Sequence, residues 1–159
     1  MIFILPAYVA NGAPVVISKL VPISHPIDLG KNFIDERRIL GNGKTVEGFI
    51  GGIALGTFTS LVLEAAGLHT VGEGFVLSIG ALLGDMTGSF IKRRLGLERG
   101  APAPLLDQLD FLFGALILYY IFYGGIDLEE LLILVVITPI LHLATNIAAY
   151  MLKLKDKPW

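Results

Sequence analysis

The sequence contains no cysteine and few charged residues. Of its 159 residues, 16% are charged and 54% are hydrophobic, and the mean hydropathy is +0.74. Without cysteine the chain forms no disulfide, no thiolate nucleophile and no cysteine-bound zinc site. A soluble domain of this size has about a quarter of its residues charged. The composition therefore excludes a disordered chain, a secreted disulfide scaffold and a typical soluble nucleic-acid-binding protein, and it predicts a surface that mostly faces lipid.

Five apolar stretches are long enough, or nearly so, to cross a bilayer as helices. A hydrocarbon core of about 30 Å requires roughly 20 apolar residues per helix. The stretches cover about residues 2–17, 46–66, 71–91, 105–123 and 128–152. The first has neither the basic start nor the small-residue cleavage site of a signal peptide. We therefore predict an all-α integral membrane protein, a single domain over residues 1–159 with about five transmembrane helices.

The basic residues indicate how these helices are oriented. All twelve Lys and Arg fall in the long connections 18–45 and 92–104 or after the fifth stretch. The other side carries an acidic group instead, which comprises Glu64, Glu73, Asp127, Glu129 and Glu130. The positive-inside rule places the N-terminus outside and the C-terminus in the cytoplasm. Because long loops are usually functional or disordered, we expect the active site of this multi-pass cell-membrane protein on the cytoplasmic side.

Two predicted helices carry glycine at every fourth position. The ladders comprise Gly48, Gly52 and Gly56 in the second stretch and Gly80, Gly84 and Gly88 in the third. Small residues at this spacing let helix backbones approach closely in lipid. The pattern favours packing of the second and third helices within one chain. The alternative is a homodimer formed through one ladder.

Asp85 lies inside the third apolar stretch, about two turns from its basic end. A carboxylate at membrane depth costs about 2.5–3.5 kcal/mol on insertion scales and normally faces a wet cavity or a partner. Ser89 and Lys92 follow at i+4 and i+7, so the three side chains share one helix face. The alternative role for Asp85 is an ion pair that serves only packing.

Asp107 and Asp110 form a second acidic group near the start of the fourth stretch. Their i, i+3 spacing aligns both carboxylates on one helix face. Such a pair beside a phosphate-bearing substrate suits Mg²⁺, which takes oxygen ligands and completes its octahedron with water and phosphate oxygens. The alternative is that these acids are favoured by the helix dipole, which explains Asp107 better than Asp110.

Two basic segments are candidates for phosphate binding. The triplet Lys92–Arg94 alone is typical of an anchor to anionic lipid, but its position near both acidic groups favours a phosphate clamp. The run Gly41-Asn42-Gly43-Lys44-Thr45 suggests phosphate binding by backbone N–H groups. It is not a Walker A loop, since Arg38 stands where the first glycine is required.

Asn11 is the remaining polar candidate, in the first apolar stretch. Pro14 frees the carbonyl of Ala10 one turn back, and Asn11 could line the resulting kink. A simple kink without function is the alternative. The three histidines are scattered along the sequence, and their spacing suggests no metal site.

The order of these residues resembles a known family. The series Asp85, Ser89, Lys92-Arg93 and Asp107-x-x-Asp110 resembles the membrane-embedded phosphatidate cytidylyltransferases, the CDP-diacylglycerol synthases. The chain is far shorter than these enzymes and lacks the Lys-Asp and His-Gly-Gly parts of their bacterial and eukaryotic signature. With Asn11-x-x-Pro14, the run at 41–45 and the glycine ladders, it is similar over nearly its whole length to the archaeal branch, the CDP-archaeol synthases.

The resemblance implies a specific reaction. CTP and 2,3-bis-O-geranylgeranyl-sn-glycerol 1-phosphate, a prenylated glycerol-phosphate lipid, would give CDP-archaeol and diphosphate with Mg²⁺ as cofactor, in archaeal phospholipid synthesis. We predict that Asp85, Asp107 and Asp110 bind the metal and, with Lys92, are catalytic. The residues predicted to bind CTP are Asn11, Gly41, Asn42, Gly43, Lys44, Thr45, Ser89, Lys92 and Arg93.

Two other functions remain as alternatives. A CDP-alcohol phosphotransferase would carry Asp-Gly-x-x-Ala-Arg and a final Asp-x-x-x-Asp, whereas here Asp85 is followed by Met86-Thr87 and the final spacing is Asp-x-x-Asp. A small ion or solute transporter would need Glu64 and Glu73 to connect to Asp85 through the bilayer. The short outer connections argue against it.

Overall fold

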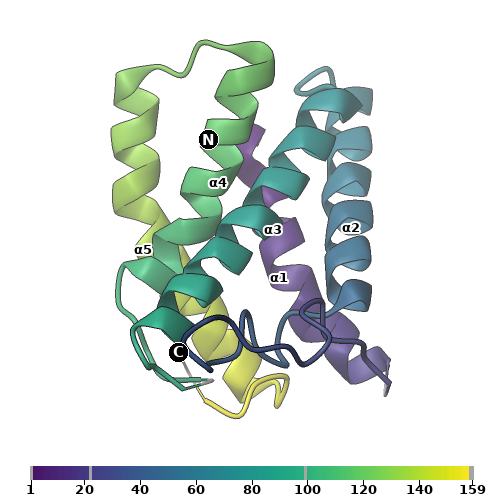
Figure 1. The fold of residues 1–159 in the computed structure, drawn as a ribbon. Helices are drawn as coiled ribbons and strands as arrows, with labels where there is room; N and C mark the ends of the chain where they lie inside the picture. The colour runs from purple at the N-terminus through teal and green to yellow at the C-terminus, as the bar shows by residue number, and fades with distance from the viewer. Residues whose placement is uncertain (1, 22, 99, 158–159) are drawn as a thin grey trace.

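The computed structural model describes residues 2–21, 23–98 and 100–157 (Figure 1). Within these ranges the chain forms helices and no strand, with two isolated β-bridges. The elements are the short 3₁₀ helix η1 (Ile2–Ile4), α1 (Leu5–Leu20), α2 (Val46–Ala65), α3 (Val71–Arg94), α4 (Leu106–Tyr123) and α5 (Leu128–Met151). Five helices have the length and apolar composition of membrane spans. The prediction of an all-α protein with five such helices is confirmed.

Two predicted helix ends fall three residues short of the observed ends, 17 against Leu20 and 91 against Arg94. The first span continues to Leu20, and α3 continues to Arg94, so the triplet Lys92–Arg94 forms the last turn of a helix instead of opening a loop. Lys and Arg are good helix formers and are favoured near the negative end of the helix dipole. Arg99, counted among the basic loop residues, lies outside the described ranges.

Large apolar side chains cover the outside of the bundle. Among them, Ile50, Phe58, Ile117, Val136 and Ile140 are each 60–66% exposed. The buried core is small by comparison and centres on Leu77, Phe111, Leu112, Ala115 and Leu134. Exposed apolar surface on this scale marks contact with a membrane or a partner. The fold is therefore that of a multi-pass membrane protein.

α3 packs on α4 where both helices carry glycine. A Cβ added to Gly80 would lie 2.6 Å from the carbonyl oxygen of Gly114, and one added to Gly84 would collide with the carbonyl oxygen of Asp110. The ladder of α3 therefore faces α4. The predicted packing of α2 on α3 is also present, but it uses another face of α3, where Leu82 and Ser78 meet Gly52 and Gly56 of α2. Gly114 supplies a matching gap on α4, so the backbones of α3 and α4 approach closely. This contact fixes the position of Asp110 relative to α3.

The ladder of α2 packs against α1, with α3 beside it. A Cβ on Gly52 would lie 2.9 Å from the carbonyl oxygen of Ala10, and one on Gly56 would collide with Ser78. The Ala10 carbonyl is the group that Pro14 frees from helical hydrogen bonding. Intramolecular packing of the ladders is thus confirmed. Both faces are buried within one chain, which leaves neither ladder for the homodimer considered as the alternative.

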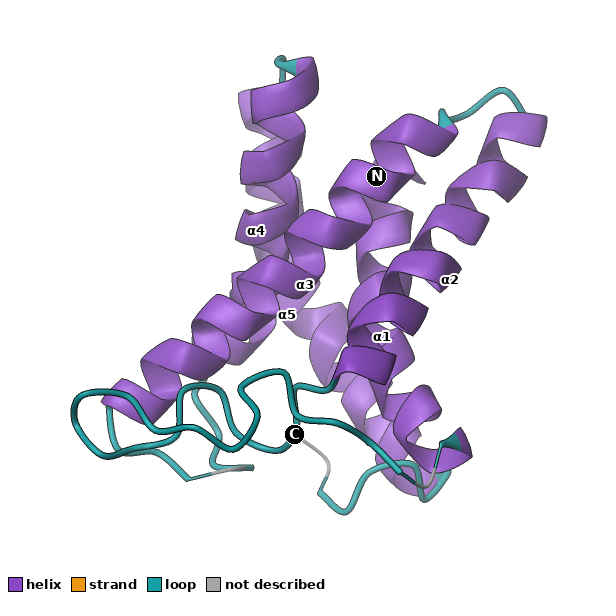
Figure 2. Cartoon of the chain, turned by 45° about the vertical axis from the view of Figure 1, so that its right-hand side comes forward, coloured by secondary structure: helices purple, strands orange, loops and turns teal. Residues whose placement is uncertain are grey.

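The two ends of the bundle differ in character (Figures 1 and 2). The short α2–α3 and α4–α5 connections lie at one end. There His69 is enclosed, with one ring nitrogen 2.5 Å from the Ser60 hydroxyl and the other 2.9 Å from the Phe3 carbonyl oxygen. The long segment before α2, the α3–α4 connection and the segment after α5 lie at the other end. Most of the predicted site residues are found at this second end.

Candidate active site

Two ion pairs join three segments at the loop-bearing end of the bundle. Lys44, just before α2, places its Nζ 2.5 Å from Oδ2 of Asp85 on α3. Lys92 on α3 places its Nζ 2.7 Å from Oδ1 of Asp107 on α4. The four side chains are between 12% and 31% exposed. Both pairs are consequently half-buried but open to a ligand, and acids from two helices are brought to one place.

Asp110 completes the acidic group from a deeper position. Its carboxylate lies against α3 at Gly88, where an added Cβ would collide with Oδ2. Its Oδ1 accepts a hydrogen bond from the N–H of Phe111 at 2.6 Å. Asp85 and Asp107 both act on Asp110 electrostatically. The three carboxyl groups therefore form one acidic group shared between α3 and α4.

The oxygen donors of this group are of the type that Mg²⁺ prefers. Within the ranges that the structure describes, no three acidic or histidine side chains are already gathered around one point as metal ligands. Asp85 and Asp107 pair with lysines instead, and Oδ2 of Asp107 also accepts the N–H of Ala103 at 2.8 Å. The donor chemistry fits a hard cation, and the metal-binding role of these residues stays a prediction.

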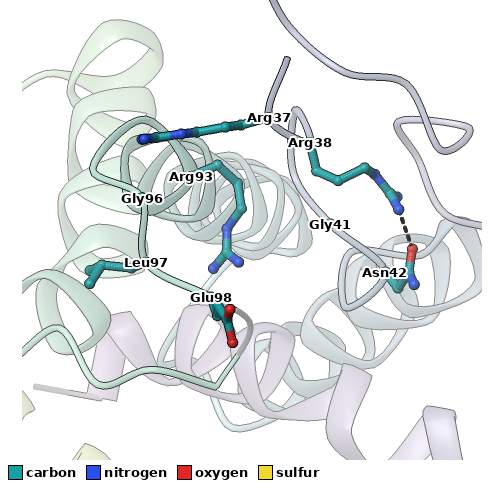
Figure 3. A pocket seen from close by; sticks show the side chains of 8 residues that line it. All are labelled: Arg37, Arg38, Gly41, Asn42, Arg93, Gly96, Leu97 and Glu98. Carbon is teal, nitrogen blue, oxygen red and sulfur yellow. Dashed lines mark hydrogen bonds between the residues drawn. The ribbon is translucent and has the colours of Figure 1, made fainter. Parts of the chain in front are cut away.

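A basic cavity of about 520 Å³ lies where the long segment before α2 meets the end of α3. Its lining residues are Arg37, Arg38, Gly41, Asn42, Arg93, Gly96, Leu97 and Glu98. Figure 3 shows the charged ends of Arg93 and Glu98 pointing into the same space, while Arg38 donates to Asn42 at 2.7 Å. The buried Nε of Arg93 has no hydrogen-bond partner among the described residues. An arrangement of several guanidinium groups suits phosphate oxygens.

A buried carboxylate organises the segment that supplies Lys44. Asp28 accepts backbone N–H groups of Gly30, Leu40 and Gly41 at 3.1, 3.0 and 2.8 Å, and its Oδ1 lies 2.6 Å from a guanidinium nitrogen of Arg38. Burial alone would raise the pKa of Asp28, but Arg38 and the three N–H groups outweigh it and hold that pKa well below its usual range. The ionised carboxylate therefore shapes the loop. The N–H of Gly41, predicted to face phosphate, donates to this carboxylate.

Arg94 fastens the same segment to α3. Its guanidinium pairs with Asp35 and donates to the carbonyl oxygen of Arg38 at 2.5 Å. It also lies 4.8 Å and 4.9 Å from the ring centres of Phe33 and Phe90, within the range of cation–π attraction. The loop that carries Lys44 and the last turn of α3 are thereby held together.

Comparison with known proteins gives a match over the whole chain. The family model described as CarS-like CDP-archaeol synthase matches residues 1–159. The chain belongs to the CDP-archaeol synthase family. The CDP-archaeol synthases of Pyrobaculum aerophilum and Pyrobaculum islandicum are 52% and 50% identical to it, each covering 99% of this chain and 96% of the relative. That of Thermofilum pendens is 49% identical, covering 100% of this chain and 79% of the relative.

One solved structure agrees with the sequence match. It is described as an intramembrane enzyme for archaeal membrane lipid biosynthesis. The superposition has a TM-score of 0.83 at 42% sequence identity and covers 92% of this chain and 91% of that one. The CDP-archaeol synthase family assignment, made from residue order, is therefore confirmed by sequence and by fold.

In this member of the CDP-archaeol synthase family, the other residues predicted to bind CTP differ in burial and in hydrogen bonding. Thr45 caps α2, its hydroxyl oxygen accepting the N–H of Gly48 at 3.1 Å. Gly43 is exposed, and Ser89 is half-buried on the face of Asp85. Asn11 is half-buried in α1, and no hydrogen bond within the described ranges joins it to the ion pairs. Thr45 thus has a clear structural role, and the predicted role of Asn11 in binding CTP stays a prediction.

A polar group on α5 was not predicted from the sequence. Asn146 Nδ2 lies 3.3 Å from Nδ1 of His142, and Nζ of Lys155 donates to Oδ1 of Asn146 at 3.0 Å. The His142 ring stacks on Phe111, next to Asp110, with ring centres 6.1 Å apart. His142 is therefore close to the acidic group and not isolated. Two polar side chains four residues apart in an apolar helix were the signal that could have revealed it.

Proposed function

We infer that this chain is a CDP-archaeol synthase, which transfers a cytidylyl group from CTP to an archaeal lipid phosphate and releases diphosphate. The full-length match to the family carries this assignment. The geometry supports it, because acidic and basic side chains meet at one end of an apolar bundle. Reactions at phosphorus are accelerated mainly by positioning and charge neutralisation, and this end of the bundle offers both.

We propose that the three carboxylates bind the magnesium ion and the lysines bind phosphate. Asp85, Asp107 and Asp110 would hold Mg²⁺, which when bound neutralises charge on the polyphosphate. Lys44 and Lys92 then exchange their carboxylate partners for phosphate oxygens. The lipid phosphate is already an anion at neutral pH, so its oxygen attacks the α-phosphorus without a protein base. The new P–O bond forms as the bond to diphosphate breaks.

The two substrates would approach from different sides. The basic cavity beside Arg93 is open at the loop-bearing end, which suits a water-soluble nucleotide. A second hollow of about 340 Å³ lies between α3 and α4; Phe113 and Ile117 line it, and so does Asp110. A lipid with its tails along this apolar face would bring its phosphate to the carboxylates. We propose that the loop-bearing end faces the cytoplasm, as the distribution of Lys and Arg favours.

The decisive experiment uses purified protein, the lipid phosphate, labelled CTP and Mg²⁺. We expect equal amounts of lipid-bound label and released diphosphate, and loss of both with a chelator. Asp107→Asn and Asp110→Asn should each lower the rate about 10²–10³-fold, the usual loss for a group that stabilises developing charge. Glu64→Gln removes the same charge at the opposite, exposed end and should stay within about twofold of the unmodified protein.

The same assay separates the alternatives. Release of CMP from a CDP-lipid, with no use of CTP, would identify a phosphotransferase. Solute flux in liposomes without any nucleotide would identify a transporter. Full activity of either aspartate variant would remove that residue from the proposed metal site.

The absence of cysteine makes the orientation directly measurable. A single cysteine in place of exposed Asp156 marks the loop-bearing end, and one in place of exposed Leu68 marks the other end. In intact cells an impermeant maleimide should label only the Leu68→Cys protein. Labelling of only the Asp156→Cys protein would place the site outside.

A further inference from the structure

The segment after α5 turns back on the helix and brings Lys155 near the two ion pairs. α5 ends at Met151, and Lys153 has a left-handed backbone with φ +57°. The N–H of Leu154 then donates to the carbonyl oxygen of Ala149 at 2.8 Å, closing a turn typical of helix C-termini. This reversal lays Lys155 against the last turns of α5. The segment lies at the loop-bearing end of the bundle (Figure 1).

Lys155 is placed among the charges of the two ion pairs. Its side chain is half-buried and interacts electrostatically with Asp107, Lys44 and Lys92. Burial and the two neighbouring lysines lower the pKa of Lys155, while Asp107 opposes them. Lys153 and Lys157, in the same segment, are exposed. A lysine needed only as a topology anchor would stay in water as these two do.

The contacts of Lys155 connect it to the acidic group. Its Nζ donates to Oδ1 of Asn146, whose amide nitrogen lies beside His142, and His142 stacks on Phe111. Phe111 follows Asp110 on α4. The side chains that hold the ammonium therefore reach α4 one residue from Asp110. When the carboxylates of that site hold a divalent cation, the lysines around them require an anion to balance their charge.

We propose that Lys155 is a third phosphate-binding lysine of this site, donating to a polyphosphate oxygen of the bound nucleotide, with Asn146 as its positioning residue. The inference rests on the proposed function for the identity of the nucleotide. It extends the site to α5 and the segment that follows it. Three ammonium groups then surround the triphosphate, one from the loop before α2, one from α3 and one from the segment after α5.

The test compares Lys155→Gln with Lys153→Gln, which removes the same charge from the same segment. The Lys155→Gln protein should show a KM for CTP raised about tenfold to a hundredfold, the range for one lost charge-assisted hydrogen bond. The KM for the lipid phosphate should change less than twofold. Lys153→Gln should keep both values, and Lys155→Arg should recover part of the affinity for CTP. Asn146→Ala should raise the KM for CTP by less, and adding it to Lys155→Gln should have no further effect.

Binding measured without turnover separates this inference from the proposed function. CTP with Mg²⁺ should raise the melting temperature of the unmodified protein in detergent, and this rise should shrink in Lys155→Gln, whose ligand-free melting temperature is unchanged. If the unmodified protein transfers no cytidylyl group, the proposed function fails, and the shift by CTP still tests Lys155. The inference is overturned if Lys155→Gln binds CTP as Lys153→Gln does. It is also overturned if Lys155→Gln loses activity only through a lower ligand-free melting temperature.

Discussion

Replacing Asp28 by Asn should release the loop that carries Lys44. Each oxygen of the carboxylate accepts donors, from Gly30 and Arg38 on one side and from Leu40 and Gly41 on the other. An amide presents one oxygen and one NH₂ group. Whichever way it turns, its NH₂ group faces N–H donors.

The expected loss follows from these contacts. Breaking a buried charge pair by changing one partner costs about 3–5 kcal/mol. The side chain of Asp28 is fully buried, and that of Arg38 is 29% exposed, so the lower part of this range applies. At about 1.4 kcal/mol per factor of ten, the ratio of docked to undocked loop should fall about a hundredfold or more. The helices do not depend on Asp28, and we therefore expect the helical bundle to remain folded.

Amide hydrogen exchange measures this ratio directly. Exchange at Leu40 and Gly41 should accelerate about a hundredfold in the Asp28→Asn protein, with unchanged exchange in the core of α3. The matched control is Asp35→Asn, which removes an exposed partner of Arg94 and should accelerate exchange less than tenfold. The KM for CTP should rise as the undocked state becomes populated. Protection of both amides equal to that in the unmodified protein would show that Asp28 does not hold the loop.

Three further predictions concern packing, docking and pH. Gly84→Ala should lower the free energy of unfolding by about 1–3 kcal/mol, because the added Cβ would collide with the backbone of α4. Gly12→Ala is the control: open space surrounds Gly12, and this variant should be neutral or stabilising in thermal unfolding. Arg94→Lys should raise the KM for CTP while leaving helix content unchanged in circular dichroism, because an ammonium cannot reproduce the paired contacts of the guanidinium. The pKa of Asp28 is lowered in the docked loop, so its contribution to docking is complete above about pH 4 and is lost only as the pH falls through the folded pKa. Amide exchange at Gly41, corrected for the intrinsic exchange rate, should therefore be constant from about pH 5 to 8.

The helices were predictable because each is a long apolar run bounded by polar residues. Helix ends were less so, since Lys92 and its neighbours are compatible with both a helix and a loop. The partner of each glycine ladder was not predictable, because a ladder specifies a smooth face and not the helix that meets it. The matching Gly114 stands alone on α4 and forms no ladder of its own.

The ion-pair cluster was predicted in part. Asp85, Lys92, Asp107 and Asp110 stood out as charged residues in or beside apolar helices, where their cost is high. Asp28 did not stand out, since a carboxylate in a polar loop is common. Its role depends on hydrogen bonds from Leu40 and Gly41, which are distant in the sequence. Lys155 was counted only as a cytoplasmic charge, because its approach to the cluster depends on a turn and on the packing of α5.

The candidate active site is assembled from segments that are far apart in the chain. The loop around Asp28, the end of α3, the start of α4 and the last turns of α5 all contribute to the same end of the bundle. A ribosome synthesising this protein must therefore deliver the final helix to the bilayer before Lys44 has its full set of neighbours. Nucleotide binding would then begin only once all five helices are inserted in the membrane. A nascent chain stalled before α5 would not bind nucleotide.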